Sequence, residues 1–312
     1  MDQRLMPVFH EIHLEDKAWV DKLLRMHNSR KTEYCFTTLF MWAESYGTRI
    51  ARFQDWLLVR SIAPNQPHPT ADYLFPAGQG DLKAAFDAIL ADAETLQLPW
   101  RIHCLSAEDL PMLQTWFPNE TWEMEPARDS FDYLYHREDL ATLKGKKYQS
   151  KRNFISRFLR NENWSYERID SADPERCREQ LEACVRLNRK WCLENGCRHN
   201  YSLQSEICAG RKALANFVPL QLKGGLLRLN DEPVAYTIGE PLNSDTFIVH
   251  IEKAFANIEG AYPMINRSFV EAETEGFLYI NREDDAGDEG LRKAKLSYHP
   301  AFLEEKYTAW KK

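Results

Sequence analysis

The chain has 312 residues, of which 44% are hydrophobic and 28% charged, and its formal net charge is -7. This composition indicates a globular protein with a substantial core, and the acidic balance argues against a protein that coats nucleic acid or acidic membrane over its whole surface. No apolar run approaches the roughly 18–20 residues that span a bilayer, and the N-terminal residues lack the apolar core of a signal peptide. We therefore expect a cytoplasmic protein without a transmembrane segment.

The first half of the chain shows alternating helical and strand periodicities. A proline-rich stretch around Pro64–Pro76 indicates a long irregular connection, and Asp81 is a candidate N-cap. The spacing of apolar residues predicts helices over 16–27, 32–46, 81–96 and 107–117, and strands over 50–53, 56–62, 100–104, 121–125 and 132–136.

The second half repeats this order of elements, although no residue-level repeat relates the halves. Helices are expected over 173–195, 204–217 and 262–275, and strands over 225–230, 234–239, 245–251, 277–281 and 306–310. The shared order predicts two similar α/β (α+β) domains, each a mixed central sheet flanked by helices. We place them at 1–140 and 141–312, with a basic linker helix at about 144–160.

That linker holds seven basic residues and no acid, although the protein as a whole is acidic. Its apolar residues fall on one helical face, which leaves most of the cations on the other. The segment is either a solvated linker helix or an anion site for phosphates of a tRNA, a nucleotide cofactor or a lipid head group, and we favour the anion site. The basic residues are Lys144, Lys146, Lys147, Lys151, Arg152, Arg157 and Arg160.

Charged residues also follow two successive predicted strands. Glu252 and Lys253 come directly after the strand over 245–251, and an acidic, glycine-bearing loop over 282–295 follows the strand that ends at Asn281. Open α/β sheets bind ligands at the ends of their strands, so the sequence predicts a site there.

A metal site is not expected. The seven cysteines include no Cys-x-x-Cys pair, and we interpret Cys184, Cys192 and Cys197, with His199 nearby, as reduced thiols rather than zinc ligands. The carboxylates of 283–289 lack the alternating spacing of a calcium-binding loop.

Three blocks of residues resemble one known family, the phosphatidylglycerol lysyltransferase C-terminal domain family of the GNAT-like N-acyltransferase fold. The resemblance implies tandem GNAT-like domains, with the active site in or beside the second. Family members with known activity move an aminoacyl group from a charged tRNA to a lipid head group. The blocks are Lys144-Gly145-Lys146-Lys147-Tyr148 with Lys151-Arg152-Asn153; Glu252-Lys253-Ala254 with Gly260-Ala261-Tyr262-Pro263 and Asn266; and Asn281 and Asp285 with Gly290-Leu291-Arg292, Lys295, Tyr298 and Pro300.

The chain departs from the family pattern in two ways. Acetyl-CoA-dependent GNAT enzymes cradle the cofactor pyrophosphate in a turn of pattern Arg/Gln-x-x-Gly-x-Gly/Ala, of which this chain keeps only Gly260, while Glu259 would repel a phosphate. This favours aminoacyl-tRNA over acyl-CoA as the donor. The lipid-modifying members carry a membrane-embedded N-terminal region that this sequence lacks, so the acceptor stays open among small molecules, peptides and lipid head groups.

Acyl transfer needs a base and a group that stabilises an oxyanion. Glu252 is the expected base, with Asp285 as an alternative base or as the group that orients the acceptor. Arg292 and Lys295 would hold a phosphate or the oxyanion, and Tyr262 or Tyr298 would protonate the leaving group. The donor phosphates would lie on Lys144, Lys146, Lys147, Lys151, Arg152 and Gly260. The structural alternatives are an exposed ion pair at Glu252, a solvated acidic loop at 283–289, and tyrosines that belong to the core.

The leading hypothesis is an acyltransferase that moves an aminoacyl or acyl group to an amine or hydroxyl acceptor, with aminoacyl-tRNA favoured as donor. Two alternatives stay open: an acyl-CoA-dependent N-acetyltransferase, and a non-catalytic module that binds an anion or RNA on the same fold.

Overall fold

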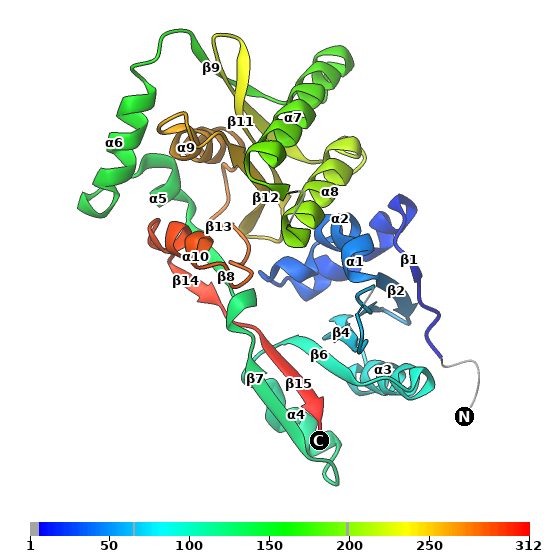
Figure 1. Ribbon diagram of the computed structural model, residues 1–312. Helices are drawn as coiled ribbons and strands as arrows, with labels where there is room; N and C mark the ends of the chain where they lie inside the picture. The colour runs from blue at the N-terminus through cyan, green and yellow to red at the C-terminus, as the bar shows by residue number, and fades with distance from the viewer. Residues whose placement is uncertain (1–5, 65, 198–199) are drawn as a thin grey trace. The chain divides into compact units, whose positions relative to one another are not determined.

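The computed structural model describes residues 6–64, 66–197 and 200–312. The chain forms two compact units, the first made of Met1–Asp132 with Glu304–Lys312 and the second of Tyr133–Leu303. Each unit is built on a mixed sheet flanked by helices (Figure 1). Among the described residues, none of the helices combines the length and the apolar character that a membrane span needs. His199, one of the residues weighed as a zinc ligand, lies outside the described residues.

The first unit has a sheet in the order β1-β2-β3-β4-β6-β15-β7, with β5 paired to β3. Among the strand pairs of the described residues in this sheet, β4 and β6 are the parallel one, and α3 makes the crossover between them. Its strands are β1 (His10–Glu11), β2 (Thr48–Phe53), β3 (Trp56–Ser61), β4 (Ala71–Leu74), β5 (Ala77–Gly78), β6 (Trp100–Leu105), β7 (Trp122–Pro126) and β15 (Tyr307–Lys311), and its helices are α1 (Lys17–His27), α2 (Phe36–Tyr46), α3 (Leu82–Leu96) and α4 (Asp109–Trp116).

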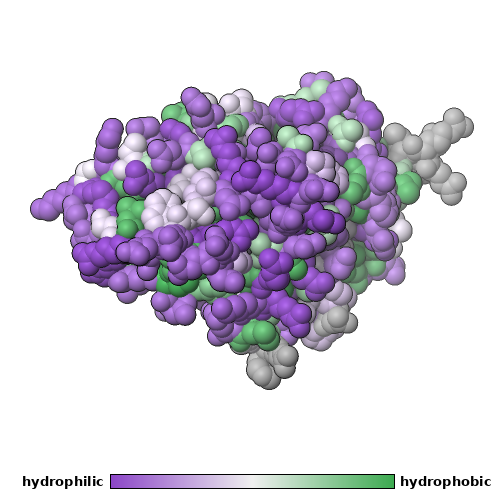
Figure 2. All heavy atoms as spheres, turned by 90° about the horizontal axis from the view of Figure 1, so that it is seen from above, coloured by the Kyte–Doolittle hydropathy of each residue, from purple (hydrophilic) through white to green (hydrophobic). Residues whose placement is uncertain are grey.

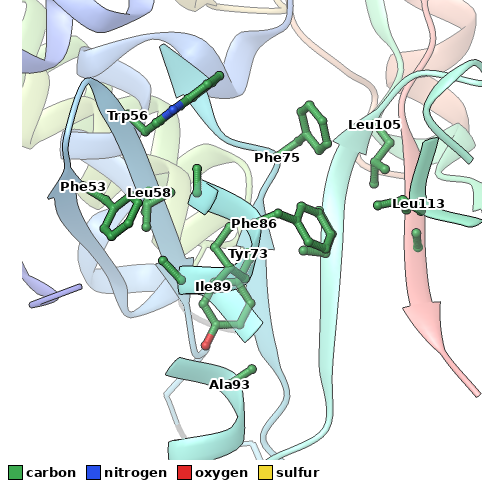
Figure 3. Close-up of a cluster of buried hydrophobic side chains, with 14 of the residues drawn as sticks. Phe53, Trp56, Leu58, Tyr73, Phe75, Phe86, Ile89, Ala93, Leu105 and Leu113 are labelled. Atoms are coloured by element: carbon green, nitrogen blue, oxygen red, sulfur yellow. The ribbon is translucent and has the colours of Figure 1, made fainter. Parts of the chain in front are cut away.

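The apolar face of α3 forms the core of this unit. Phe86 and Ile89 are fully buried and pack with Tyr73 of β4 and Leu105 of β6 (Figure 3). The helix begins where the sequence predicts, because the Asp81 carboxylate accepts a hydrogen bond of 3.0 Å from the backbone N–H of residue 84.

The second unit has a sheet in the order β14-β8-β13-β12-β11-β10-β9. Here β12 and β13 pair in parallel, and α9 connects them. Its strands are β8 (Asp132–His136), β9 (Trp164–Arg168), β10 (Lys223–Leu229), β11 (Glu232–Pro241), β12 (Thr246–Ala254), β13 (Tyr279–Asn281) and β14 (Phe302–Glu304), and its helices are α5 (Arg137–Thr142), α6 (Gln149–Phe158), α7 (Pro174–Glu194), α8 (Tyr201–Ala215), α9 (Ala261–Glu273) and α10 (Glu289–Leu296).

Each sheet takes one strand from the other half of the chain. The C-terminal strand β15 lies between β6 and β7 of the first sheet, and β8 lies between β13 and β14 of the second. The chain therefore passes from the first unit to the second at Asp132 and returns at Glu304, whereas the sequence analysis divided it once, at residue 140. The physical reason is backbone pairing, since the inner edges of β6 and β7 need hydrogen-bond partners and β15 supplies them.

The parallel pair of the second sheet determines where a site can lie. β12 and β13 are paired only from Thr246 with Tyr279 to Ile248 with Asn281, and β12 continues to Ala254 without β13 beside it. Beyond Ile248, the backbone of β12 is therefore not paired with β13, and a site at the strand ends can be built from this part of β12 and from the residues just after β13.

Several elements differ from the sequence-based expectation. The N-terminal part of the helix expected over 32–46 is a separate 3-10 turn at Thr32–Tyr34, and Cys35 separates it from α2. β4 lies inside the proline-rich connection, and α10 follows the acidic loop of 283–289. The sequence does not predict these two elements, because both are short and lie in polar or proline-rich stretches. Figure 2 shows one face of the molecule, where hydrophilic residues predominate and apolar ones are scattered among them.

Candidate functional site

Glu252 lies on β12 beyond the stretch paired with β13. Its neighbours on the strand alternate in direction, so that Glu252 and Lys253 point to opposite faces of the sheet. Its carboxylate accepts hydrogen bonds of 2.9 Å from Nη2 of Arg282 and 2.8 Å from Nδ2 of Asn266 on α9. The side chains of Glu252 and Arg282 are only 11% and 13% exposed, so this is a nearly buried ion pair and not the exposed pair weighed above.

Two polar atoms beside this carboxylate have no hydrogen-bond partner. Among the described residues, Nη1 of Arg282 and Oδ1 of Asn266 are buried and unpartnered, and Asn266 as a whole is 1% exposed. The orientation of the amide is fixed by the carboxylate, which can only accept, so the nitrogen must face Glu252 and the oxygen must point elsewhere. An unused donor and an unused acceptor thus lie near Glu252, and both atoms are buried.

Lys151 and Tyr298 complete the group. The Arg282 guanidinium lies 4.7 Å from the ring centre of Tyr298, and the Lys151 ammonium lies 3.8 Å from the same ring centre. Lys151 also donates a hydrogen bond of 2.6 Å to Oγ of Ser297. We call Glu252, Asn266, Arg282, Lys151 and Tyr298 the Glu252 cluster; its members come from β12, α9, α6 and the segments that follow β13 and α10.

Burial and mutual repulsion set the protonation of this cluster. Burial, and then the nearby Arg282 cation, lower the pKa of Lys151 to about 8, although Glu252 acts in the opposite direction. Burial also raises the pKa of the Tyr298 hydroxyl well above its usual value, which keeps the phenol protonated at neutral pH. For Arg282, burial alone would lower the pKa, but the attraction of Glu252 outweighs it and the net shift is upward.

Tyr262 belongs to a neighbouring polar group that includes Lys253. Its hydroxyl accepts a hydrogen bond of 3.2 Å from Nε1 of Trp191, and burial raises its pKa. The Lys253 ammonium lies 3.7 Å from the ring centre of Trp191 and donates a hydrogen bond of 2.6 Å to Glu206. The two tyrosines named by the sequence analysis therefore lie in two different groups, and only Tyr298 contacts Arg282.

Asp285 is held by donors from its own loop, from α10 and from β8. Arg292 donates to both carboxylate oxygens at 2.9 and 2.8 Å, Tyr133 donates at 2.5 Å, and the backbone N–H of Gly287 donates at 3.0 Å. Burial would raise the pKa of Asp285, but these hydrogen bonds outweigh it and hold the pKa well below the usual range. A fully buried carboxylate with this many donors is suited to fix the loop, and Arg292 is suited to neutralise it.

Lys295 also stabilises this loop. Its ammonium donates to the carbonyl of Arg282 at 2.6 Å and to the carbonyl of Asp284, and the residue is almost fully buried. Arg282 is thus oriented from its own backbone by Lys295. Sequence reasoning named Arg292 and Lys295 as site residues but did not assign a role to Arg282, although its place directly after a strand was a signal that could have found it.

The lysines and arginines of the basic segment differ in their exposure and in their partners. Lys144 is exposed, with 82% of its side chain accessible; Lys146 is also exposed, and Lys147 is exposed while it pairs with Asp139 at 2.9 Å. Arg152 donates to the carbonyls of Leu143 and Gly145 and therefore holds the turn before α6. The sequence analysis assigned Lys144, Lys146, Lys147, Lys151 and Arg152 to the donor phosphates. Of these five, Lys151 contacts the Glu252 cluster, through Tyr298.

The turn before α9 is packed against α6. Gly260 has a φ of +82°, and a Cβ built there would lie 2.1 Å from the carbonyl oxygen of Phe154. Next to it, Glu259 accepts a hydrogen bond from Arg157 of the same helix. Gly260 is therefore required by the close approach of α6 as well as by its own backbone conformation.

The cysteines weighed as zinc ligands show the properties of thiols. Cys184 is fully buried, and burial raises the pKa of its thiol. Cys197 is buried as well, and burial, then its neighbour Cys192, raise its pKa to about 11.

Comparisons with known proteins identify related sequences and folds. The family model described as phosphatidylglycerol lysyltransferase, C-terminal, matches residues 24–310. A conserved protein of unknown function from Bacteroides thetaiotaomicron VPI-5482 is 37% identical, with a TM-score of 0.89 over 98% of this chain and 100% of that chain. A relative in Mycoplasmoides gallisepticum, described as uncharacterized, is 23% identical over 66% of this chain, and the match spans 65% of that relative's length.

Two further structures share the fold at low sequence identity. The C-terminal domain of a putative lysylphosphatidylglycerol synthetase from Agrobacterium fabrum is 13% identical, with a TM-score of 0.66 over 95% of this chain and 91% of that chain. A tandem GNAT protein from the clavulanic acid biosynthesis pathway is 8% identical, with a TM-score of 0.50 over 98% of each chain. The predicted fold class, tandem GNAT-like domains built on mixed sheets, is confirmed.

Proposed function

The chain belongs to the phosphatidylglycerol lysyltransferase C-terminal family, and from that membership we propose that it transfers aminoacyl groups from aminoacyl-tRNA to an amine or hydroxyl acceptor. Family and fold point to an acyltransferase of this type or of the GNAT type. The proposal adds the donor and the site, the Glu252 cluster of the second unit.

One observation carries the proposal. α6 belongs to the basic segment, and Lys151 on this helix contacts Tyr298 of the Glu252 cluster. The exposed cations Lys144, Lys146 and Lys147 precede the same helix. A donor with many phosphates and one activated ester can place its phosphates on these cations while its ester reaches the cluster.

The cluster has the groups that acyl transfer needs. Nη1 of Arg282 is a buried cationic donor without a partner, which suits the oxyanion that forms on the acyl carbonyl. The Glu252 carboxylate accepts two hydrogen bonds and would attract a positively charged part of a substrate. Tyr298 is protonated at neutral pH and would supply a proton to the departing oxygen. We assign Asp285, Arg292 and Lys295 to holding the loop that carries Arg282, and Tyr262 to the adjoining polar group.

The surroundings of Gly260 disfavour acyl-CoA as the donor. In a CoA-dependent enzyme of this fold, backbone N–H groups of this turn would face the cofactor pyrophosphate. Here the Phe154 carbonyl lies against Gly260, and the Glu259 carboxylate, paired with Arg157, lies next to it, so a pyrophosphate at this turn would meet oxygen atoms that repel it. This packing supports the choice of aminoacyl-tRNA over the CoA-dependent alternative.

The test uses tRNA charged with a mixture of radiolabelled amino acids. Loss of label from tRNA is followed with phosphatidylglycerol vesicles, with an amine mixture and with water as acceptors. We expect transfer by the wild-type chain and a loss of about 100-fold or more in Arg282→Met, as is typical when an oxyanion donor is removed. Lys190→Met is the matched control, because Lys190 is an exposed cation on α7, 4.6 Å from the ring centre of Phe255.

The same experiment separates the rival functions. A wild-type chain that binds tRNA in a salt-dependent way but transfers nothing would be a binding module, and the proposal would be wrong. Acetyl-CoA at modest concentration should leave the melting temperature unchanged. Thermal protection by acetyl-CoA, together with acetyl transfer, would replace the donor that we propose.

A further inference from the structure

Lys151 differs from the other cations of the basic segment in where its ammonium lies. It is 2.6 Å from Oγ of Ser297 and 3.8 Å from the ring centre of Tyr298, whereas Lys144 and Lys146 are exposed. A lysine that served to attract tRNA phosphates would be expected on the open surface, where it keeps its hydration and its charge. The position of Lys151 suggests a different role.

We infer that Lys151 is the base that accepts the proton of the attacking acceptor, and that it is not a contact to the donor phosphates. The inference deepens the proposed acyl transfer and rests on it. It names the proton acceptor, which the sequence analysis placed at Glu252 or Asp285.

Burial and the neighbouring Arg282 cation favour the neutral form of Lys151, and they outweigh the attraction of Glu252 and of the Tyr298 ring for the ammonium. Arg282, which follows β13, is a cation beside it, and Tyr298 and Ser297, which follow α10, are uncharged. Glu252 of β12 is the nearby anion, but both of its oxygens already accept hydrogen bonds, from Arg282 and Asn266. Within the part of the chain that the structure describes, Lys151 forms no ion pair. A cation that is half buried beside another cation, without a carboxylate of its own, loses its proton more readily.

Ser297 holds the amine in place without taking its lone pair. The Ser297 hydroxyl donates a hydrogen bond of 2.6 Å to the carbonyl of Ala294, so toward Lys151 it can only accept. One N–H of Lys151 is used in this way. A neutral amine keeps its lone pair for a proton from a group bound at the Glu252 cluster, and the pKa of about 8 leaves a usable neutral fraction near pH 7.5.

The step conserves atoms and protons. Lys151 takes the proton from the hydroxyl or neutral amine of the acceptor, and the acceptor oxygen or nitrogen forms a bond to the acyl carbonyl carbon. The bond between that carbon and the ribose oxygen of the donor breaks, and the ribose oxygen leaves with its electron pair. The Lys151 ammonium then protonates that oxygen, directly or through Tyr298, so the base returns to its neutral form. No oxidant or reductant is needed.

Substitution by arginine separates the two roles of Lys151. Lys151→Arg keeps a positive charge for phosphates but does not deprotonate near neutral pH, whereas Lys151→Met removes charge and base together. We expect both variants to lose about 100-fold or more in single-turnover transfer from mixed aminoacyl-tRNA, and to bind uncharged tRNA within about twofold of the wild type. Lys190→Arg and Lys190→Met are the matched controls, expected to transfer at the wild-type rate.

A Lys151→Arg protein that transfers within about threefold of the wild type would overturn the inference and leave the proposed function standing. An inactive wild-type chain would refute the proposed function, and the role of Lys151 with it.

A second measurement does not depend on activity. Competitive labelling of the whole protein with acetic anhydride between pH 6 and pH 11, read by mass spectrometry of the peptide that contains Lys151, reports the titration of this amine. We expect a midpoint near pH 8 for Lys151, well below the usual lysine value of about 10.4. A Lys151 midpoint near the usual lysine value would overturn the inference whatever the activity of the variants.

Discussion

Replacing Lys151 by methionine is expected to stabilise the folded protein at neutral pH. Burial lowers the pKa of Lys151 from 10.5 to about 8 in the folded state. Between about pH 8 and pH 10.5 the unfolded chain holds this proton and the folded chain does not, so the free energy of unfolding rises with pH across that window. Below about pH 8 both states hold the proton, and the full cost of a half-buried charge is present.

The size of the effect follows from this shift and from the contacts of the side chain. A difference of about 2.5 pH units corresponds to roughly 3 kcal/mol, as an upper bound. The ammonium is partly exposed, so screening by water reduces this figure to about 2 kcal/mol. Methionine keeps the apolar stem but loses the contact with the Tyr298 ring and the hydrogen bond to Ser297, which together are worth about 1 kcal/mol. We expect a net gain of about 1 kcal/mol at pH 7.

Thermal unfolding at two pH values measures this gain. Lys151→Met should raise the melting temperature by about 2–4 °C at pH 7, and by much less at pH 10.5, where the wild-type lysine is neutral when folded. Lys190→Met, which removes an exposed lysine of the same unit, should show no such pH-dependent difference. A lower melting temperature for Lys151→Met at pH 7, or an equal gain at both pH values, would refute the argument that the charge of Lys151 is unfavourable in the folded state.

Three further substitutions test the site. Gly260→Ala should lower the free energy of unfolding by about 2 kcal/mol or more and displace α6, because the new Cβ would lie 2.1 Å from the Phe154 carbonyl oxygen. The control is Gly276→Ala, also at positive φ but in open space, which should lower the free energy of unfolding by about 1 kcal/mol. Denaturant unfolding measures both. Asp285→Asn should lower the free energy of unfolding by about 3 kcal/mol or more at pH 7, and this difference from the wild type should shrink as acid protonates the wild-type carboxylate. An unchanged unfolding midpoint would contradict the role of Asp285 in holding its loop. Glu252→Gln should reduce transfer about 100-fold, and full activity would exclude Glu252 from the site.

The sequence by itself predicted the main helices and strands and proposed a site at the ends of two strands. Apolar periodicity and caps such as Asp81 located the main helices and strands, because these signals act within a few residues. The charges expected after two successive strands pointed to Glu252, which the structure places on β12 itself, beyond the stretch paired with β13. The three blocks that resemble the family supplied the tandem GNAT-like fold.

Only the tertiary structure decided which residues are partners. Periodicity shows which face of a strand is buried but not which strand lies beside it, so the exchange of β8 and β15 between the sheets was beyond reach. Asp285 and Arg292 are bound to each other, and Lys151 meets Ser297 and Tyr298 across a long stretch of chain. A pKa depends on burial and on charges near in space, so the sequence located a basic segment and the fold singled out one lysine within it.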